Sequence, residues 1–245
     1  MNSALRQCGH RQALAISRIL NTTSRRYTTN TPRQTDGQKV RISILDHALT
    51  KVDQLGWTPA AIEQAATDLG YSPMALASRD GMPLIDHFMD RALDETCIEA
   101  DDQLHEFDTP IDRIRFLCRV RLRQTRPYIR RWPEAAALLA QPGNVRVAMG
   151  QLSTLVSRMW YLAGDQSTQI DWHAKRSMLA AAYVASELYM CEDTSTDFSA
   201  TWKFLDRRIE DMQGVEHTAT MAQTFGNQFS RNLFNILASR GYISQ

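Results

Sequence analysis

Polar and charged side chains that could do chemistry are concentrated in residues 163–177, AGDQSTQIDWHAKRS, between two long apolar segments. Such a cluster is typical of an active site, of a helix N-terminus or of a surface for a partner. Thr168 followed three positions later by Asp171 fits a capping box, and Asp171 would lie in the positively polarised first turn of the next helix. Capping does not explain Trp172 and Arg176, which are favoured anchor residues of protein interfaces. The cluster therefore predicts a helix start followed by a docking surface.

The chain lacks the motifs of the common enzyme classes, since it has no GxSxG, GxxxxGK[ST], HExxH or GxGxxG. Asp102, His105 and Glu106 would share one helical face and could bind a metal, but a di-iron bundle requires two Glu-x-x-His repeats and the chain has none. We interpret His105 as a surface histidine. The cysteines form no CxxC pair and imply no disulfide or zinc framework: Cys8, Cys97, Cys118 and Cys191. We therefore predict that the protein is not an enzyme and has neither catalytic residues nor metal ligands.

Helices must position these side chains. Every segment after residue 38 has helical periodicity, and Gly and Pro fall between the segments. No apolar stretch reaches the roughly 18 to 20 residues that a membrane span needs. We expect an all-α protein with helices over residues 40–55, 59–69, 73–79, 82–104, 109–126, 133–140, 144–163, 169–191, 197–213 and 216–239.

The first three predicted helices are separated by clear turn and cap residues. Gly56 ends the first helix, Thr58 caps the second, and Gly70 ends it before a short helix that Ser72 caps. This unit resembles the N-terminal helix-turn-helix domain of the tetracycline-repressor (TetR) family. In that family the short third helix enters the DNA major groove. Residues 40–106 carry four basic and thirteen acidic side chains, a formal net charge of −9, which would repel a duplex. We therefore expect a packing scaffold that binds no nucleic acid; a TetR-type transcription regulator with an apolar ligand pocket is the alternative function.

A basic segment follows the acidic unit. Residues 113–131, RIRFLCRVRLRQTRPYIRR, contain eight arginines and no acidic residue. Ile114, Leu117, Cys118 and Arg121 keep helical spacing, which predicts an amphipathic basic helix. Two explanations stay open: the arginines pair with the acidic side chains of the unit before them, or they bind an anionic membrane or an acidic partner.

The beginning of the chain has a different composition. The first 33 residues contain six arginines and no acidic residue, and they are rich in Ser and Thr. Residues 1–27 are therefore predicted to be a mitochondrial transit peptide, followed by a polar linker over residues 28–38. A disordered basic tail is the alternative.

The end of the chain, residues 214–245, is predicted to form an amphipathic helix that associates with a membrane. Its apolar stripe recurs at every fourth position, with one further phenylalanine alongside: Met221, Phe225, Phe229, Leu233, Leu237 and Phe234. Docking of this helix on the body of the protein, or pairing with a second subunit, are the alternatives.

Between these ends we expect a helix-turn-helix-like subdomain over residues 39–106 and a helical bundle over residues 107–213. Residues 177–191, SMLAAAYVASELYMC, are apolar nearly all round, as a central helix should be. Their Ala, Met and Tyr content suits the wall of an apolar cavity as well as plain core packing. The candidate cavity residues are Leu155, Met178, Ala182, Tyr183 and Tyr189.

Seven motifs recur in a known family: GWTPAAI (56–62), LIDHF (84–88), RPYIRRWPEA (126–135), MWYLAGDQST (159–168), DWHAKRSMLAA (171–181), TSTDFSATWKFLDRRI (194–209) and GVEHTA (214–219). Through these motifs the chain resembles the mitochondrial ubiquinone-biosynthesis accessory proteins, which have a TetR-like fold. The resemblance implies a non-catalytic protein, expected to be a homodimer, that binds isoprenoid lipids in the bundle and needs no cofactor beyond a bound lipid or quinone intermediate.

The same resemblance implies a location and a partner. The protein would lie on the matrix side of the mitochondrial inner membrane as a peripheral protein, with the last helix as its membrane contact. It would present ubiquinone precursors to the di-iron demethoxyubiquinone hydroxylase within the wider ubiquinone-biosynthesis complex. The family's partner-docking surface maps onto Met159, Leu162, Trp172, His173 and Arg176, with His173 in place of an aromatic phenol.

Overall fold

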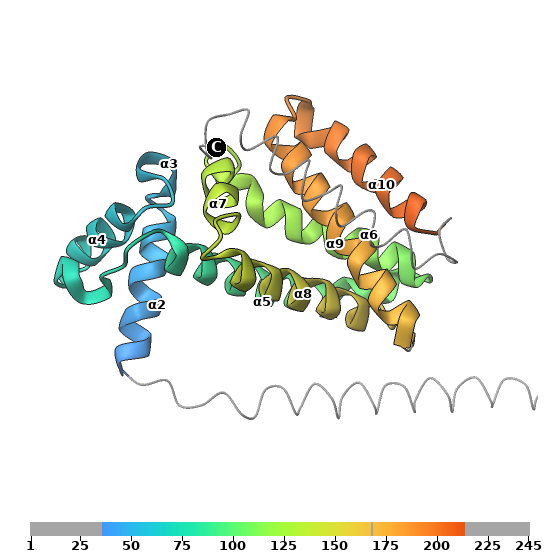
Figure 1. Cartoon of the computed structure of the whole chain (residues 1–245), viewed down its shortest axis with the longest axis horizontal. Coiled ribbons are helices and arrows are strands. Elements are labelled where there is room, and N and C mark those ends of the chain that lie inside the picture. The colour runs from blue at the N-terminus through green and yellow to red at the C-terminus, as the bar shows by residue number, and fades with distance from the viewer. Residues whose placement is uncertain (1–35, 168, 214–245) are drawn as a thin grey trace, which may run out of the picture. The chain divides into compact units, whose positions relative to one another are not determined.

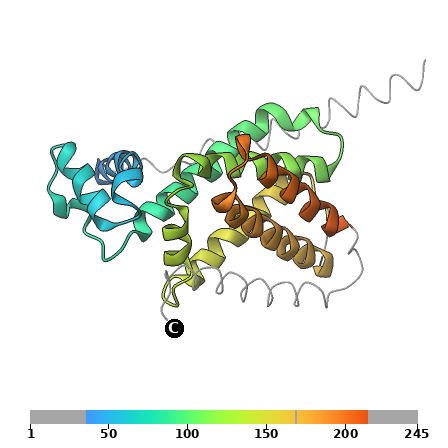
Figure 2. The same ribbon diagram turned by 90° about the horizontal axis from the view of Figure 1, so that it is seen from above.

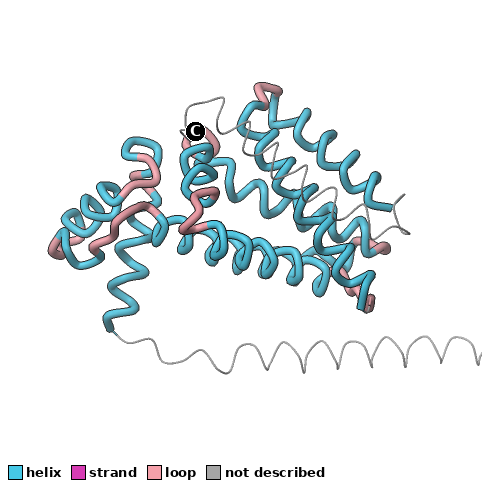
Figure 3. The backbone as a smooth tube through the Cα atoms, in the orientation of Figure 1, coloured by secondary structure: helices cyan, strands magenta, loops and turns pink. Residues whose placement is uncertain are grey.

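The structure is a computed structural model that describes residues 36–167 and 169–213, apart from the side chains of residues 169–171 and 213. The chain divides into two units, residues 1–43 and 44–245. Of the first unit only residues 36–43, the first part of helix α2, are described. The described part of the chain contains helices and no strands, as Figures 1 and 3 show, so the all-α prediction is confirmed.

The elements follow one another as α2 (Asp36–Leu49), α3 (Val52–Leu55), α4 (Pro59–Asp68), η1 (Pro73–Leu76), α5 (Met82–Gln103), η2 (Leu104–Glu106), α6 (Pro110–Thr125), η3 (Arg126–Tyr128), α7 (Trp132–Leu139), α8 (Val145–Leu162), α9 (Gln169–Glu192), η4 (Thr196–Phe198) and α10 (Ser199–Gln213). Most predicted helices recur within a few residues of their expected ends. Caps explain the agreement at several starts; Thr109, for example, accepts a hydrogen bond from the Asp112 amide at the start of α6.

The helix-turn-helix-like unit differs from the prediction in three places. The expected helix over residues 40–55 is two helices, because the chain turns at Thr50, whose hydroxyl donates to the His47 carbonyl. The expected helix over residues 73–79 is a four-residue 3₁₀ turn, since none of its side chains is buried to hold a longer helix. Helix α2 begins at Asp36, so the last three residues of the expected linker are helical.

An aromatic cluster joins this unit to the bundle. The Trp57 ring packs edge-on against the rings of Phe88 and Trp132 at centroid distances of 5.7 and 5.6 Å. Gly81 allows the close approach behind it, because a Cβ atom at this position would lie 2.0 Å from the Trp57 carbonyl oxygen. Helix α5 therefore starts against the turn that contains Trp57.

The core of the bundle surrounds α6, whose buried side chains meet those of α8, α9 and α10. Helices α9 and α10 lie side by side in both ribbon views (Figures 1 and 2). The fully buried side chains of α6 include Ile114, Leu117 and Cys118, the apolar positions of the predicted amphipathic pattern. The helical period of the apolar residues in the sequence thus agrees with the side chains that α6 buries.

The arginines of α6 are largely used inside the bundle. Arg115 and Arg119 both pair with Asp206 of α10, at 3.2 and 2.7 Å. Arg123 lies 3.7 Å from Glu99, which belongs to the acidic region before the bundle. Intramolecular pairing therefore accounts for these charges, but its main acidic partner lies in α10 and not in residues 40–106.

Candidate functional site: an apolar cavity and a tryptophan surface

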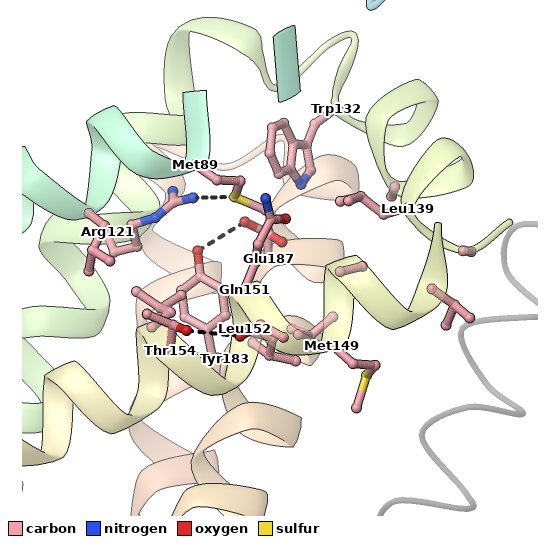
Figure 4. A pocket seen from close by; sticks show the side chains of 18 of the residues that line it. Met89, Arg121, Trp132, Leu139, Met149, Gln151, Leu152, Thr154, Tyr183 and Glu187 are labelled. Carbon is pink, nitrogen blue, oxygen red and sulfur yellow. Dashed lines mark hydrogen bonds between the residues drawn. The ribbon is translucent and has the colours of Figure 1, made fainter. Parts of the chain in front are cut away.

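A cavity of about 360 Å³ lies among helices α5, α7, α8 and α9, with one side chain from α6 (Figure 4). Most of the side chains around it are apolar. The lining residues are Met89, Asp90, Leu93, Arg121, Trp132, Ala136, Leu139, Ala140, Val145, Ala148, Met149, Gly150, Gln151, Leu152, Thr154, Leu155, Tyr183, Val184, Glu187 and Leu188. The cavity suits an apolar ligand of limited size.

The lining residues range from exposed to fully buried, and this range gives the cavity a mouth and an inner end. Val145 and Met149, in the first turns of α8, are exposed, Met149 by 59%. Trp132, Arg121 and Tyr183 are each about 1% exposed. An apolar ligand that entered between the exposed side chains would reach the buried ones deep in the bundle.

The inner end is polar. The Tyr183 hydroxyl donates to Glu187 Oε1 at 2.9 Å, and both side chains are buried (Figure 4). The Arg121 guanidinium donates to Thr125 Oγ1 at 3.1 Å and to Met89 Sδ at 2.9 Å. These side chains place a guanidinium, a carboxyl group and a hydroxyl next to a mainly apolar space.

Burial governs the acid–base properties of this polar end. Burial raises the pKa of Glu187, while the charge of Arg121 and the hydrogen bond from Tyr183 act in the opposite direction. Burial also raises the pKa of Tyr183 well above its ordinary value. The hydroxyl therefore keeps its proton and donates a hydrogen bond. Partial burial raises the pKa of Asp90, another lining residue, and the charges of Asp86 and Asp94 raise it further.

Two polar atoms of the cavity residues have no hydrogen-bond partner within the described part of the chain. These are Arg121 Nε and Gln151 Oε1, both of them buried. The other end of the Gln151 amide donates to Asp86 at 2.8 Å, which fixes the orientation of the amide. A buried donor and a buried acceptor are thus left without protein partners, which is costly unless something else satisfies them.

Of the five candidate cavity residues, Leu155 and Tyr183 line the cavity and the other three do not. Ala182 is buried in the core beside the cavity, and Met178 packs partly buried against that core. Tyr189 is 38% exposed and stacks on Phe204 of α10 at 4.6 Å. The reason is helical period: α9 presents residues 183, 184, 187 and 188 to the cavity, and the three others lie on different faces.

Sequence reasoning missed Arg121 and Glu187 as cavity residues. A signal for Arg121 existed, because it keeps helical register with Ile114, Leu117 and Cys118, which are buried. Glu187 is the acidic residue inside the apolar segment 177–191. The sequence pattern therefore showed one charged residue among the apolar positions of each of these two helices.

The polar cluster that follows α8 is organised around Asp165. This carboxylate accepts hydrogen bonds from Ser167 Oγ at 2.6 Å, Lys175 Nζ at 3.1 Å and Arg176 Nη1 at 3.3 Å, and its side chain is 4% exposed. Burial raises the pKa of Asp165, but the hydrogen bonds from Ser167 and Lys175 bring it below its ordinary value. The expected capping box of Thr168 and Asp171 lies outside the described side chains.

The predicted docking residues are divided between surface and core. Trp172 and His173 are exposed on α9, with ring centroids 4.7 Å apart, and Arg176 stacks on Trp172. Leu162 is half-buried and packs against the core. The expectation that Met159 belongs to this surface is wrong, because its side chain is 0% exposed and contacts Cys118 Sγ at 4.0 Å.

Other predictions lie outside the described residues: the transit peptide, most of the linker, and the last helix with Met221, Phe225, Phe229, Leu233, Phe234 and Leu237. Among the helices that are described, none combines the length and the apolar character that crossing a membrane requires. Across the same residues, no group of three or more His, Cys, Asp or Glu side chains could hold a metal ion.

The chain is similar to known proteins in sequence and in fold. A family model described as COQ9 matches residues 145–216. The human ubiquinone biosynthesis protein COQ9, mitochondrial, is 35% identical over 205 residues, which are 80% of this chain and 64% of the human protein. The COQ9-A protein of Xenopus laevis is 34% identical over 222 residues, 85% of this chain and 70% of that protein. The chain spans 60 to 66% of the length of the first three curated relatives.

A crystal structure of the TetR transcriptional regulator from Nitrosomonas europaea superposes with a TM-score of 0.59 at 20% sequence identity. The superposition covers 72% of this chain and 99% of the regulator. At this identity the likeness concerns the fold, and it confirms the TetR-like fold predicted from the sequence.

Proposed function

The chain belongs to the COQ9 family, and from this premise we propose that it is a non-catalytic accessory protein of ubiquinone biosynthesis. In this proposal the bundle binds an isoprenoid lipid or quinone intermediate and presents it to the enzyme that modifies it. The relatives' names place them in ubiquinone biosynthesis and in mitochondria.

The observation that carries the proposal is the cavity. Its volume of about 360 Å³ lies at the lower end of the range of about 300 to 1,000 Å³ of small-molecule sites, and its walls are mainly apolar. A head group and the first isoprene units would occupy this volume. The exposed side chains of Val145 and Met149 at the mouth would let the rest of a long tail extend from the cavity along apolar surface.

The partner in this proposal is the di-iron demethoxyubiquinone hydroxylase, which would dock on the exposed Trp172 and His173 with Arg176 beneath them. Tryptophan and arginine are enriched among the residues that dominate interface energies. The hydroxylase carries the metal and performs the reaction, and this chain supplies the bound substrate.

The proposed location follows from the relatives and from the two ends of the sequence. Residues 1–27 direct the protein to mitochondria, and residues 214–245 attach it to the matrix side of the inner membrane as a peripheral protein. We retain the homodimer as part of this proposal. Neither end is described by the structure.

Mass spectrometry of the lipid extracted from the purified full chain tests the proposal. We expect an isoprenoid quinone or quinone precursor at close to one per chain, and loss of this lipid in Ala148→Trp, which fills the mouth. Arg146→Trp is the matched control, because Arg146 is exposed on the same helix and does not line the cavity. A protein that folds normally and carries no lipid, or that carries it equally in both variants, would overturn the proposal.

The likeness to a TetR regulator favours one other candidate, a transcription regulator that senses an apolar ligand. The net charge of −9 in residues 40–106 and the four-residue turn in place of a recognition helix argue against DNA binding. A salt-sensitive, sequence-specific shift of DNA by the purified chain would establish this second function.

A further inference from the structure

We propose that the buried Asp165 holds the docking surface in the shape that the hydroxylase recognises: its carboxylate fixes Arg176, and Arg176 fixes the Trp172 ring. Asp165 is a positioning residue in this inference, because its side chain is 4% exposed and acts through the other two. The inference rests on the proposed function, since it assumes that the hydroxylase docks on Trp172. It adds the buried group that sets the geometry of this surface.

The Asp165 carboxylate lies between the end of α8 and the second turn of α9, where it meets two cations. Lys175 Nζ donates to Oδ1 at 3.1 Å, and Arg176 Nη1 donates to Oδ2 at 3.3 Å. Ser167 Oγ donates to the same Oδ2 at 2.6 Å. Because both carboxylate oxygens are held by hydrogen bonds, the carboxylate has one orientation, and it orders the cations that pair with it.

Arg176 transmits this order to the surface. Its Nη1 donates to the Trp172 carbonyl at 3.1 Å, and its guanidinium lies 3.9 Å from the centroid of the Trp172 ring. The Arg176 side chain is 11% exposed, whereas Trp172 is 36% exposed. A planar guanidinium stacks on the face of an aromatic ring, and an ammonium presents only a point charge. The exposed ring therefore lies on a largely buried support whose position Asp165 sets.

Lys175, the other cation, connects the same carboxylate to the core. Its ammonium lies 5.4 Å from the centroid of the Trp160 ring, and the Trp160 indole N–H donates to the Lys175 carbonyl at 3.3 Å. Trp160 is buried in the core of the bundle. Burial raises the pKa of Asp165, but the hydrogen bonds from Ser167 and Lys175 hold it below its ordinary value, so the carboxylate is ionised at neutral pH. Asp165 thus ties the docking surface to the core.

Asp165→Asn keeps the shape of the side chain and removes the charge that holds Arg176. Calorimetric titration of the purified full chain with the hydroxylase should show an affinity about fivefold lower, because Trp172 must then be ordered on binding. Asp206→Asn is the matched control, since Asp206 also pairs with two cations, Arg115 and Arg119. Asp206 lies on α10, outside the docking surface, and its replacement should change the affinity by less than about twofold.

A second background separates positioning from a general loss of stability. In Trp172→Ala the ring is absent, so adding Asp165→Asn should change the affinity by less than about twofold. A purely structural role would give the same loss in both backgrounds. The indole N–H resonance of Trp172, assigned by its absence in Trp172→Ala, gives a readout without the partner. This resonance should shift in Asp165→Asn and stay in place in Asp206→Asn.

The outcomes separate this inference from the proposed function. If the native chain does not bind the hydroxylase, the proposed docking fails and this inference fails with it. If the native chain binds and Asp165→Asn binds equally well, docking stands and the role of Asp165 is overturned. An equal loss in the Trp172→Ala background also overturns it.

Arg176→Lys decides the matter even if Asp165→Asn does not fold. The lysine keeps a positive charge for Asp165 but cannot stack as a plane on the Trp172 ring. We expect this variant to lose about fivefold in affinity for the hydroxylase and to shift the Trp172 indole resonance. A native affinity together with an unchanged resonance would overturn the inference.

Discussion

The Arg176 guanidinium lies 3.9 Å from the centroid of the Trp172 ring, one turn further along α9. The same guanidinium donates to the Trp172 carbonyl and to the Asp165 carboxylate, at 3.1 and 3.3 Å. The exposed indole therefore packs on a side chain that is tied to the loop after α8. Such an arrangement presents the ring in one orientation, which lowers the entropy lost when a partner binds.

Trp172→Lys should abolish association with the hydroxylase while leaving the fold intact, because the side chain is 36% exposed and does not belong to the core cluster. Loss of an interface tryptophan costs about 2 kcal/mol or more, which is about thirtyfold in affinity. Co-purification of the two proteins measures it. Tyr71→Lys, which changes an exposed aromatic residue before η1, is the control and should co-purify with the hydroxylase normally. If Trp172→Lys recovers as much hydroxylase as Tyr71→Lys does, Trp172 does not belong to the docking surface.

Met159→Ala should destabilise the protein and not weaken docking directly. The side chain is fully buried among α6 and α8 side chains, and truncation of such a methionine costs about 2 to 5 kcal/mol. Urea unfolding followed by circular dichroism measures the change. Partner binding by the folded fraction at low temperature should equal that of the native protein, and a selective loss of binding with unchanged stability would contradict the core position.

Asp193 should make the protein sensitive to acid. Burial raises its pKa, but hydrogen bonds from the backbone and side chains of Ser195 and Thr201 lower it more, from 3.8 to about 2. Because the folded pKa is depressed, the stabilisation is complete above about pH 4 and disappears as the pH falls toward 2. Asp193→Asn should therefore lose about 1 kcal/mol at pH 7 and converge with the native protein near pH 2.

Thermal unfolding of the native protein and of Asp193→Asn between pH 2 and 7 checks this prediction. Asp108→Asn is the control, since Asp108 is exposed in the turn before α6. A stability difference between Asp193→Asn and the native protein that stays constant down to pH 2 would contradict the assigned hydrogen bonds.

Gly81→Ala should destabilise the protein at the start of α5. The added Cβ would lie 2.0 Å from the Trp57 carbonyl oxygen, which is backbone and cannot move aside easily. Overpacking of this kind typically costs about 1 to 3 kcal/mol or more. Chemical denaturation measures the loss. Gly143→Ala, where nothing lies within 4 Å of the added atom, should change stability by less than about 0.5 kcal/mol.

Removal of residues 216–245 should reduce flotation of the protein with liposomes that contain acidic lipids. The phenylalanine-rich stripe of this segment would supply the apolar contact with the membrane. Deletion of the segment should leave the melting temperature of the bundle close to that of the full chain. If flotation persists, the arginines of residues 113–131 become the better candidate for membrane contact.

Local signals in the sequence predicted most of the helices. Gly56, Gly70 and the cap residue Ser72 marked element ends that recur in the structure, because capping and positive φ depend on the residue and its nearest neighbours. Thr58 lies at the expected start of α4, but its hydroxyl donates to the Leu55 carbonyl and does not cap the helix. The same holds for the absence of strands in the described residues and for the exposed position of Trp172. The TetR-like fold was likewise visible, through the spacing of turns and apolar stripes.

Packing between helices determined what the sequence left open. The stripe that contains Met159 could face a core or a partner, and only the position of α6 against α8 buried it. Arg121 lies in a segment of eight arginines, several of which form ion pairs with acidic side chains. Arg121 differs from these because its side chain is buried in the interior near Glu187. The helical period predicts which residues share a face of a helix. Which of these faces borders the cavity depends on how α5, α6, α7, α8 and α9 pack together. The local sequence pattern therefore predicted the fold, whereas the chemistry of the cavity depends on the tertiary structure.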